Sequence, residues 1–161
     1  MKISMSSADF LHDRCPQREH AVDHDESDDQ VLTDDERCRL EVLLSFLEPD
    51  ADPVRAHDHY HDEAVLEFPQ SGERFEGVVN FRTWREQYPA DVEFRLRRIT
   101  GSGELWVREL SVSYDGGPSM LGIAVVEFDG PKVRRERIYV TEPWEAPEWR
   151  AQWRATRPSD P

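Results

Sequence analysis

The residues of this chain with the clearest capacity for chemistry are charged side chains that interrupt apolar, strand-like segments. Glu136 lies in Val133–Thr141, on the same side of a predicted strand as Arg134 and Ile138. A carboxyl group buried in an apolar cavity has a raised pKa, because its charged form loses water, and it can then act as a general base near neutral pH. Glu127 lies beside a predicted hairpin turn, where water has access. We therefore expect Glu136, rather than Glu127, to be a catalytic residue.

Arg108 is the second candidate catalytic residue, in the predicted strand Leu105–Tyr114. Neighbouring residues of a strand point to opposite faces, so a solvated Glu109 would direct Arg108 inward. An inward Arg108 needs a carboxylate partner, and Glu136 or Glu67 can supply it. Beside Glu136 it would lower the pKa of that carboxyl. Such a pair is either a structural cross-link or a site for an anion or oxyanion, and the sequence leaves both open.

Histidines and a tyrosine complete the candidate chemistry. His57 and His61 are four residues apart, on one face of a predicted helix, but no third ligand follows at a recognisable spacing, so we predict no metal site. His61 is expected at the mouth of a pocket, where it could relay a proton, and the alternative is that it is simply exposed. The hydroxyl of Tyr139 could donate to a substrate oxygen, or it could bind a main-chain carbonyl.

The sequence shows no pattern for an organic cofactor either. Its glycines fall in turns, not in a GxGxxG run after a strand, and no GxSxG is present. The sequence therefore predicts neither a nucleotide-binding loop nor a nucleophilic serine of that type.

The elements that must position these residues are helices followed by strands. Thr33-Asp-Asp-Glu36 is a capping box, and leucines recur at helical spacing until Pro49. Asp52-Pro53 predicts a second helix, to about Tyr60. Beyond it we predict a strand at Ala64–Phe68, a helix at Gly77–Tyr88, strands at Val92–Arg97, Leu105–Tyr114, Met120–Phe128 and Val133–Thr141, and a short helix from about Pro147 that carries Trp149 and Trp153.

This order predicts an α+β fold, with three helices on a strongly curved antiparallel sheet that forms a cone with an internal pocket. Met120–Phe128 is apolar on both faces, which predicts a central strand. Its second face would leave a large exposed apolar patch, so we expect a homodimer through the open face of the sheet.

Three segments resemble the NTF2-like superfamily and, within it, the SnoaL-like branch. They are Tyr60–Phe68, Gly72–Gly77 and Gly130–Tyr139, and the similarity spans about residues 36–155. Glu142-Pro143 departs from the ending common in that branch. Fold alone does not define a function.

The resemblance implies a deep apolar pocket and cofactor-independent acid/base chemistry of the isomerase, cyclase, dehydratase or hydrolase type. The substrate would be a small apolar or polyketide-like molecule. The alternative is a non-catalytic, dimeric binding or interaction module. By this resemblance the pocket would be lined by Tyr60, Glu67, Phe68, Trp84, Trp106 and Ile138.

The net charge of the chain limits the classes of partner that it can bind. The chain has 161 residues and a net charge of −14, which opposes binding to nucleic acids and to anionic membrane surfaces. No apolar run reaches the 18–20 residues of a membrane span, and Cys15 and Cys38 are too few for a disulfide scaffold. We therefore expect a cytoplasmic protein.

Domain organisation follows from the same composition. Residues 1–32 read as an acidic, disordered tail, because they have little to bury. Residues 33–155 are predicted to form one domain, followed by a C-terminal tail at 156–161.

Overall fold

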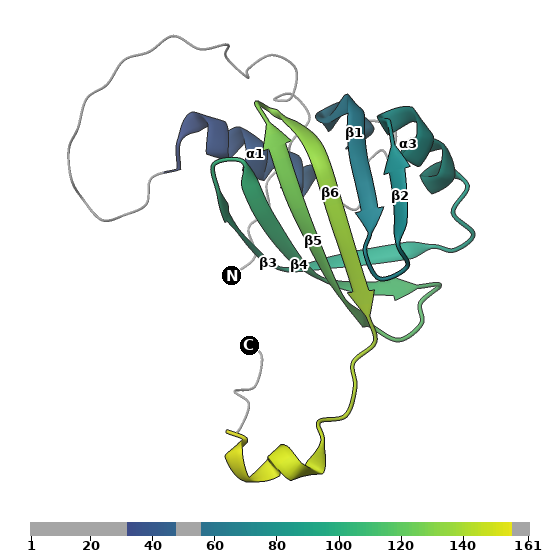
Figure 1. The fold of residues 1–161 in the computed structure, drawn as a ribbon, viewed down its shortest axis with the longest axis vertical. Coiled ribbons are helices and arrows are strands. Elements are labelled where there is room, and N and C mark those ends of the chain that lie inside the picture. Colours follow the sequence, from purple (N-terminus) through teal and green to yellow (C-terminus); the bar gives the residue numbers. More distant parts are fainter. Residues whose placement is uncertain (1–31, 48–55, 156–161) are drawn as a thin grey trace, which may run out of the picture.

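The computed structural model describes residues 32–47 and 56–155. The predictions for the acidic tail, for Cys15, for the helix signals at Pro49 and Asp52-Pro53, and for residues 156–161 fall outside these ranges. Within them, a curved six-stranded sheet has the strand order β2-β1-β6-β5-β4-β3, and it is not closed into a barrel. Helices α1 (Asp34–Ser45) and α3 (Val78–Glu86) lie on one face of this sheet (Figure 1). No helix of the described ranges has the length and apolar character that crossing a membrane requires.

Helix α1 begins where its sequence predicts. The Thr33 hydroxyl accepts a hydrogen bond from the Glu36 backbone N–H at 3.2 Å, and the Glu36 carboxylate accepts one from the Thr33 N–H at 3.0 Å. This reciprocal pair satisfies backbone donors that the first turn leaves free. Leu43 is buried in the core, and the buried Arg39 donates to the carbonyls of Gly103 and Gly130. α1 is thereby fixed to two hairpin turns of the sheet.

The strands confirm the predicted meander and add two features to it. The strands are β1 (Tyr60–Phe68), β2 (Glu73–Glu76), β3 (Val92–Ser102), β4 (Leu105–Tyr114), β5 (Met120–Asp129) and β6 (Lys132–Thr141). Strand β2, which is not among the predicted strands, pairs with β1. Strand β1 runs parallel to β6, so the sheet is mixed and not wholly antiparallel. No local turn joins β1 to β6. Their relative direction is therefore determined by tertiary packing and not by a short connection.

The end of the second predicted helix is also different. Its described part is a short 3₁₀ turn, η1 (His57–His59), and Tyr60 already belongs to β1. His57 and His61 consequently do not share the face of one helix, and the premise of a paired-histidine ligand set is wrong.

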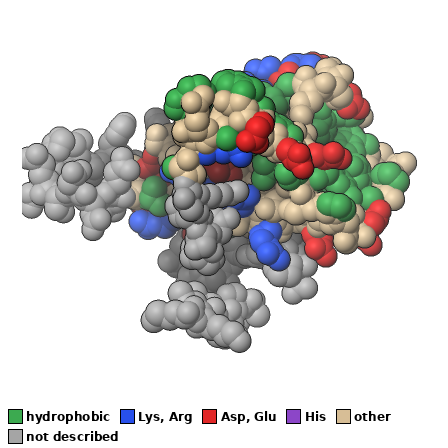
Figure 2. Space-filling model, turned by 90° about the horizontal axis from the view of Figure 1, so that it is seen from below, with side chains coloured by type: hydrophobic (Ala, Val, Ile, Leu, Met, Phe, Trp, Pro, Cys, Tyr) green, Lys and Arg blue, Asp and Glu red, His purple; other side chains and the backbone are tan. Residues whose placement is uncertain are grey.

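The two faces of the sheet differ in composition. The inner face, beneath α1 and α3, carries core residues such as Leu66, Trp106 and Val126. The outer face exposes Leu105, Leu121 and Ile123 among charged residues. After β6 the chain leaves the sheet and forms a separate 3₁₀ turn, η2 (Glu148–Trp153) (Figure 1). Seen from that end of the molecule, hydrophobic side chains gather in patches with Asp and Glu side chains between them (Figure 2).

Candidate functional site

Glu136 is the centre of a buried polar cluster on the inner face. It lies on β6 between Leu66 of β1 and Val126 of β5, and it is 1% exposed. Its Oε1 accepts a hydrogen bond from Arg108 Nη2 at 2.6 Å. The other carboxylate oxygen, Oε2, accepts from two further groups, the Tyr60 hydroxyl at 2.5 Å and Arg85 Nη2 at 3.2 Å. Three elements besides β6 thus converge on one carboxylate: β1, β4 and α3.

These partners decide the protonation state of Glu136. Burial raises the pKa of its carboxyl, but the charges of Arg108 and Arg85 and the hydrogen bonds from Tyr60 and Arg85 outweigh burial, so the pKa lies below the ordinary value. Glu136 is therefore an ionised, fully engaged carboxylate at neutral pH. A carboxylate in this state is a poor proton acceptor, because protonation would break its ion pairs.

The pKa of Tyr60 shifts in the opposite direction to that of Glu136. Burial first, and then the neighbouring Glu136 charge, raise the pKa of its phenol well above the ordinary value. The hydroxyl therefore remains protonated and serves as a hydrogen-bond donor. The sequence predicts Tyr60 in the ligand pocket. In the structure it belongs to the polar cluster, where it donates to Glu136.

Arg108 links the cluster to helix α1. Its Nη1 donates to the Leu43 carbonyl at 3.4 Å, and its guanidinium lies 5.1 Å from the centre of the Phe46 ring. Its Nε is buried and has no hydrogen-bond partner among the described residues. Arg108 is directed inward as predicted, and of its two candidate partners, Glu136 and Glu67, the structure pairs it with Glu136.

Arg85 is the most accessible charged member of the cluster. Its side chain is 23% exposed, whereas that of Glu136 is 2% exposed. Its Nη1 lies 3.4 Å from Nε2 of the buried His57, and its guanidinium approaches the rings of Tyr60, Phe81 and Trp84. Two arginines therefore face a single carboxylate, and the cluster has a surplus of positive charge and of N–H donors.

Sequence reasoning missed Arg85 and assigned His57 to a different role. A signal for Arg85 was present, because it follows Phe81 by four residues and so lies on the buried face of α3. The sequence presents His57 only as half of a pair with His61. Its approach to Arg85 depends on how α3 packs against the start of β1, which local spacing does not show.

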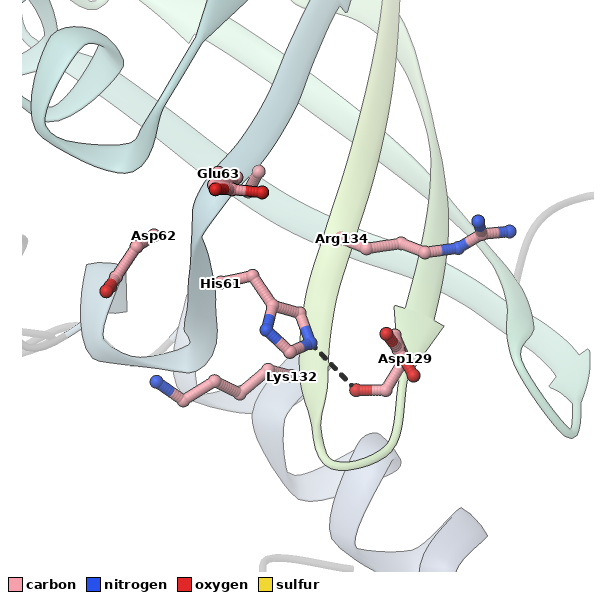
Figure 3. A pocket seen from close by; sticks show the side chains of 7 residues that line it. His61, Asp62, Glu63, Asp129, Lys132 and Arg134 are labelled. Carbon is pink, nitrogen blue, oxygen red and sulfur yellow. Dashed lines mark hydrogen bonds between the residues drawn. The ribbon is translucent and has the colours of Figure 1, made fainter.

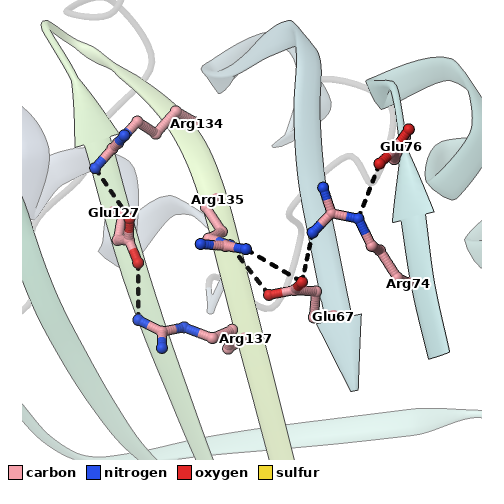
Figure 4. A network of polar contacts seen from close by, with 7 residues as sticks. All are labelled: Glu67, Arg74, Glu76, Glu127, Arg134, Arg135 and Arg137. Carbon is pink, nitrogen blue, oxygen red and sulfur yellow. Dashed lines mark hydrogen bonds and ion pairs between the residues drawn. The ribbon is translucent and has the colours of Figure 1, made fainter. Parts of the chain in front are cut away.

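Two predicted site residues lie on the outer face. Tyr139 is paired with Ile123, whose side chain is exposed, and it therefore points away from Glu136. Glu67 binds Arg74 at 2.6 Å and Arg135 at 3.0 Å, within a network of outer-face ion pairs (Figure 4). Because Leu66 pairs with Glu136 on the inner face, Glu67 must point outward. Strand parity therefore corrects the predicted catalytic role of Tyr139 and the predicted pocket position of Glu67.

His61 lies in a surface hollow, away from the Glu136 cluster. Its Nε2 is 2.9 Å from the Asp129 carbonyl, and Lys132 and Arg134 line the same hollow (Figure 3). The proton-relay role predicted for His61 has no support here, because none of these neighbours belongs to the cluster. No group of three or more His, Cys, Asp or Glu suited to a metal occurs in the described part of the chain.

The remaining predicted pocket residues belong to the inner face but pack closely. Phe68 and Trp84 meet edge to face at 5.9 Å, and Ile138 packs against the core. Trp106 is buried and donates from Nε1 to the Gly103 carbonyl at 3.0 Å. The Nε1 of Trp84 is buried with no hydrogen-bond partner among the described residues. The inner face thus presents an apolar aromatic wall beside the polar cluster, with a second orphan donor.

Comparison with known proteins identifies the class. No family model and no curated protein matches this sequence. Among solved structures, an NTF2-like protein of unknown function from Burkholderia xenovorans LB400 is 37% identical, with a TM-score of 0.69 over 77% of this chain and 98% of its own. At that identity and coverage, the chain belongs to the NTF2-like superfamily, which confirms the resemblance.

More distant structures share the fold. A candidate ketosteroid isomerase from Kribbella flavida is 17% identical, with a TM-score of 0.69 over 77% of this chain and 93% of its own. An LEH-like epoxide hydrolase from M. tuberculosis is 21% identical, with a TM-score of 0.56 over 65% of this chain and 83% of its own. At these identities the likeness concerns architecture alone.

Proposed function

We propose that this protein binds a small, largely apolar molecule on the inner face of its sheet, with a polar oxygen of the ligand directed at the Glu136 cluster. The observation that carries this proposal is the buried surplus of donors around one carboxylate, from Tyr60, Arg85 and Arg108. Buried donors are normally satisfied, so an unpaired Arg108 Nε favours an additional acceptor. The surrounding aromatic wall favours an apolar, polyketide-like body for the ligand.

The chemistry that this arrangement supports is stabilisation of negative charge on a ligand oxygen. Preorganised donors in a water-poor site stabilise an enolate or oxyanion much more strongly than water does. Arg85 is the donor that a ligand reaches first, because it is the most exposed charged member. Glu136 acts as a positioning residue, which holds Arg85, Arg108 and Tyr60 in place. This fits a cofactor-independent isomerase, cyclase, dehydratase or hydrolase reaction.

A thermal-shift screen tests the proposal, with steroid-like, polyketide-like and epoxide compounds as probes. Binding to the native state raises the melting temperature by mass action. We expect at least one probe to stabilise the wild type, and Arg85→Gln to abolish that shift. Arg82→Gln is the matched control, because Arg82 lies on the same helix and, among the described residues, forms its ion pair with the exposed Glu86. No stabilising probe, or equal shifts in both variants, would contradict the proposal.

The second candidate function is a non-catalytic, dimeric binding module. Two observations favour it: Glu136 is too engaged to accept a proton, and the outer face exposes Leu105, Leu121 and Ile123. We propose a homodimer through this outer face, since monomers rarely expose large apolar patches. Light scattering across micromolar concentrations tests it, and a constant mass of 18.8 kDa would contradict it.

A further inference from the structure

The segment after β6 exposes three tryptophans. Of the five in the chain, Trp144, Trp149 and Trp153 are 75%, 69% and 70% exposed. We refer to Glu142–Arg154 as the tryptophan arm. It leaves the end of β6 and extends away from the sheet (Figure 1).

The tryptophan arm has a structure of its own. Trp149 and Trp153 meet edge to face at 6.3 Å, and the Arg150 guanidinium lies 5.3 Å from the Trp149 ring. Arg154 donates to the carbonyls of Ala146 and Pro147. Exposing so much aromatic surface on an ordered element is unfavourable, because each indole can bury roughly 150–250 Å² on contact with a partner. We therefore expect the three indoles of the arm to be buried against another protein surface.

A surface that fits the arm lies on the outer face of β5. Leu121 and Ile123 are 40% and 44% exposed, and Val125 continues the same row at spacing of two residues. We refer to these three residues as the β5 stripe. Leu121 is paired with Thr141, the last residue of β6, so the stripe begins beside the point where the arm departs.

We propose that the tryptophan arm of one copy packs on the β5 stripe of a second copy, so that two arms are exchanged within a dimer. This inference rests on the proposed homodimer and names the contact that holds it. The arm projects from the end of β6 and does not lie on its own sheet (Figure 1), and Pro143 and Pro147 restrict the backbone within it. The exchanged occupant is therefore the arm of a second chain.

The area available is sufficient for a stable dimer. Six tryptophans from two arms can bury about 900–1,500 Å², and with the surface they cover this reaches the roughly 1,600 Å² of a standard interface. Both the arm and the outer face carry charges of both signs. The arm has Glu145, Glu148, Arg150 and Arg154. On the sheet, the exposed Glu109 is paired with Ile123 of the stripe, and the exposed Arg95 and Arg98 lie on β3, two strands away. The apolar and charged parts of the arm thus both have counterparts on the sheet.

Mixing two broken variants tests the exchange. The arm variant carries Trp144→Ser, Trp149→Ser and Trp153→Ser, and the stripe variant carries Ile123→Glu. Light scattering should give a dimer for the wild type and a monomer for each variant alone. Their mixture should regain a heterodimer, because the intact arm of one chain meets the intact stripe of the other. Circular dichroism verifies the fold of each variant.

Each outcome decides a separate point. Val79→Ser removes an equally exposed hydrophobic side chain on α3 and should leave the dimer unchanged. A monomeric wild type would overturn the homodimer and the exchange together. A dimeric arm variant would overturn the exchange and leave the homodimer standing. Two monomeric variants that fail to combine would also overturn the exchange, because that result indicates an arm docked on its own sheet.

Discussion

The two faces of the sheet use the same residue types for different purposes. On the inner face, Glu136 binds Arg108 and Arg85 where its side chain is 2% exposed. On the outer face, Glu67 and Glu127 each bind two arginines (Figure 4). Their own side chains are 19% and 17% exposed, and those of the four arginines are 34–54% exposed. Water screens the outer pairs and not the inner one. The same Arg–Glu contact is therefore decisive on one face and nearly dispensable on the other.

Among variants that compare the two faces, Glu136→Gln should cause the largest loss of unfolding free energy. Removing the carboxylate leaves the buried Arg108 and the half-buried Arg85 without a compensating charge, which costs about 3–5 kcal/mol of unfolding free energy. Glu127→Gln on the outer face should cost at most about 1 kcal/mol. Urea denaturation of both variants measures the difference. Equal losses would show that burial does not separate the two faces.

Tyr60→Phe should come next in size. It deletes the hydroxyl that donates to Glu136 at 2.5 Å, and the loss of a buried hydrogen bond to a charged group costs about 1.5–3 kcal/mol. Tyr139→Phe, on the outer face, should change stability by less than about 0.5 kcal/mol. Thermal melts of the two variants compare them directly. A larger loss for Tyr139→Phe would reverse our assignment of the faces.

Lowering the pH should reduce the stability of the folded protein, because Glu136 becomes protonated and its ion pairs are lost. The pKa of this carboxyl is lowered from its ordinary value of 4.5 in the folded state, so its ion pairs contribute stability above that pH. That contribution is lost as the pH falls below 4.5 and through the folded pKa. The urea midpoint between pH 7 and pH 3 should therefore fall more steeply in the wild type than in Glu136→Gln. Parallel curves would exclude Glu136 as a source of the acid sensitivity.

The smallest effect concerns salt and the outer face. Glu67→Gln should cost at most about 1 kcal/mol at low ionic strength, and the cost should shrink further in 1 M salt, where the Debye length is about 3 Å. The cost of Glu136→Gln should change much less, because its pairs are shielded from solvent. Melting temperatures at low and high sodium chloride test this. A salt effect of equal size in both variants would break the comparison.

Several parts of this molecule were predictable because their causes are local. The capping box at Thr33 determines the start of α1, and alternation over Leu105–Tyr114 gives the bounds of β4 without error. The same alternation directed both Arg108 and Glu136 inward, as the structure shows, and charge pairing left Glu136 or Glu67 as the partner of Arg108. The family also followed from the sequence, through three short segments in the right order.

Other parts depended on contacts between distant segments. Strand β2 is four residues long, and its edge position appears only once β1 is in place. The face of Glu67 depends on its register with β6, since a shift of one residue would reverse it. Arg85 joins Glu136 because α3 packs over β1, and the two residues lie 51 positions apart.

The sequence by itself determined the fold class, the inward placement of Arg108 and Glu136, and the superfamily, because each rests on periodicity or short motifs. Only the tertiary structure decided that Glu136 is the partner of Arg108 and which way the pKa of Glu136 shifts. It brought Arg85 and Tyr60 to the same carboxylate, and their combined effect lowers the pKa of Glu136 where burial alone would raise it. The physical reason is that the pKa of a buried group depends on every charge that packs against it. A strand pattern records only the alternation along one chain segment.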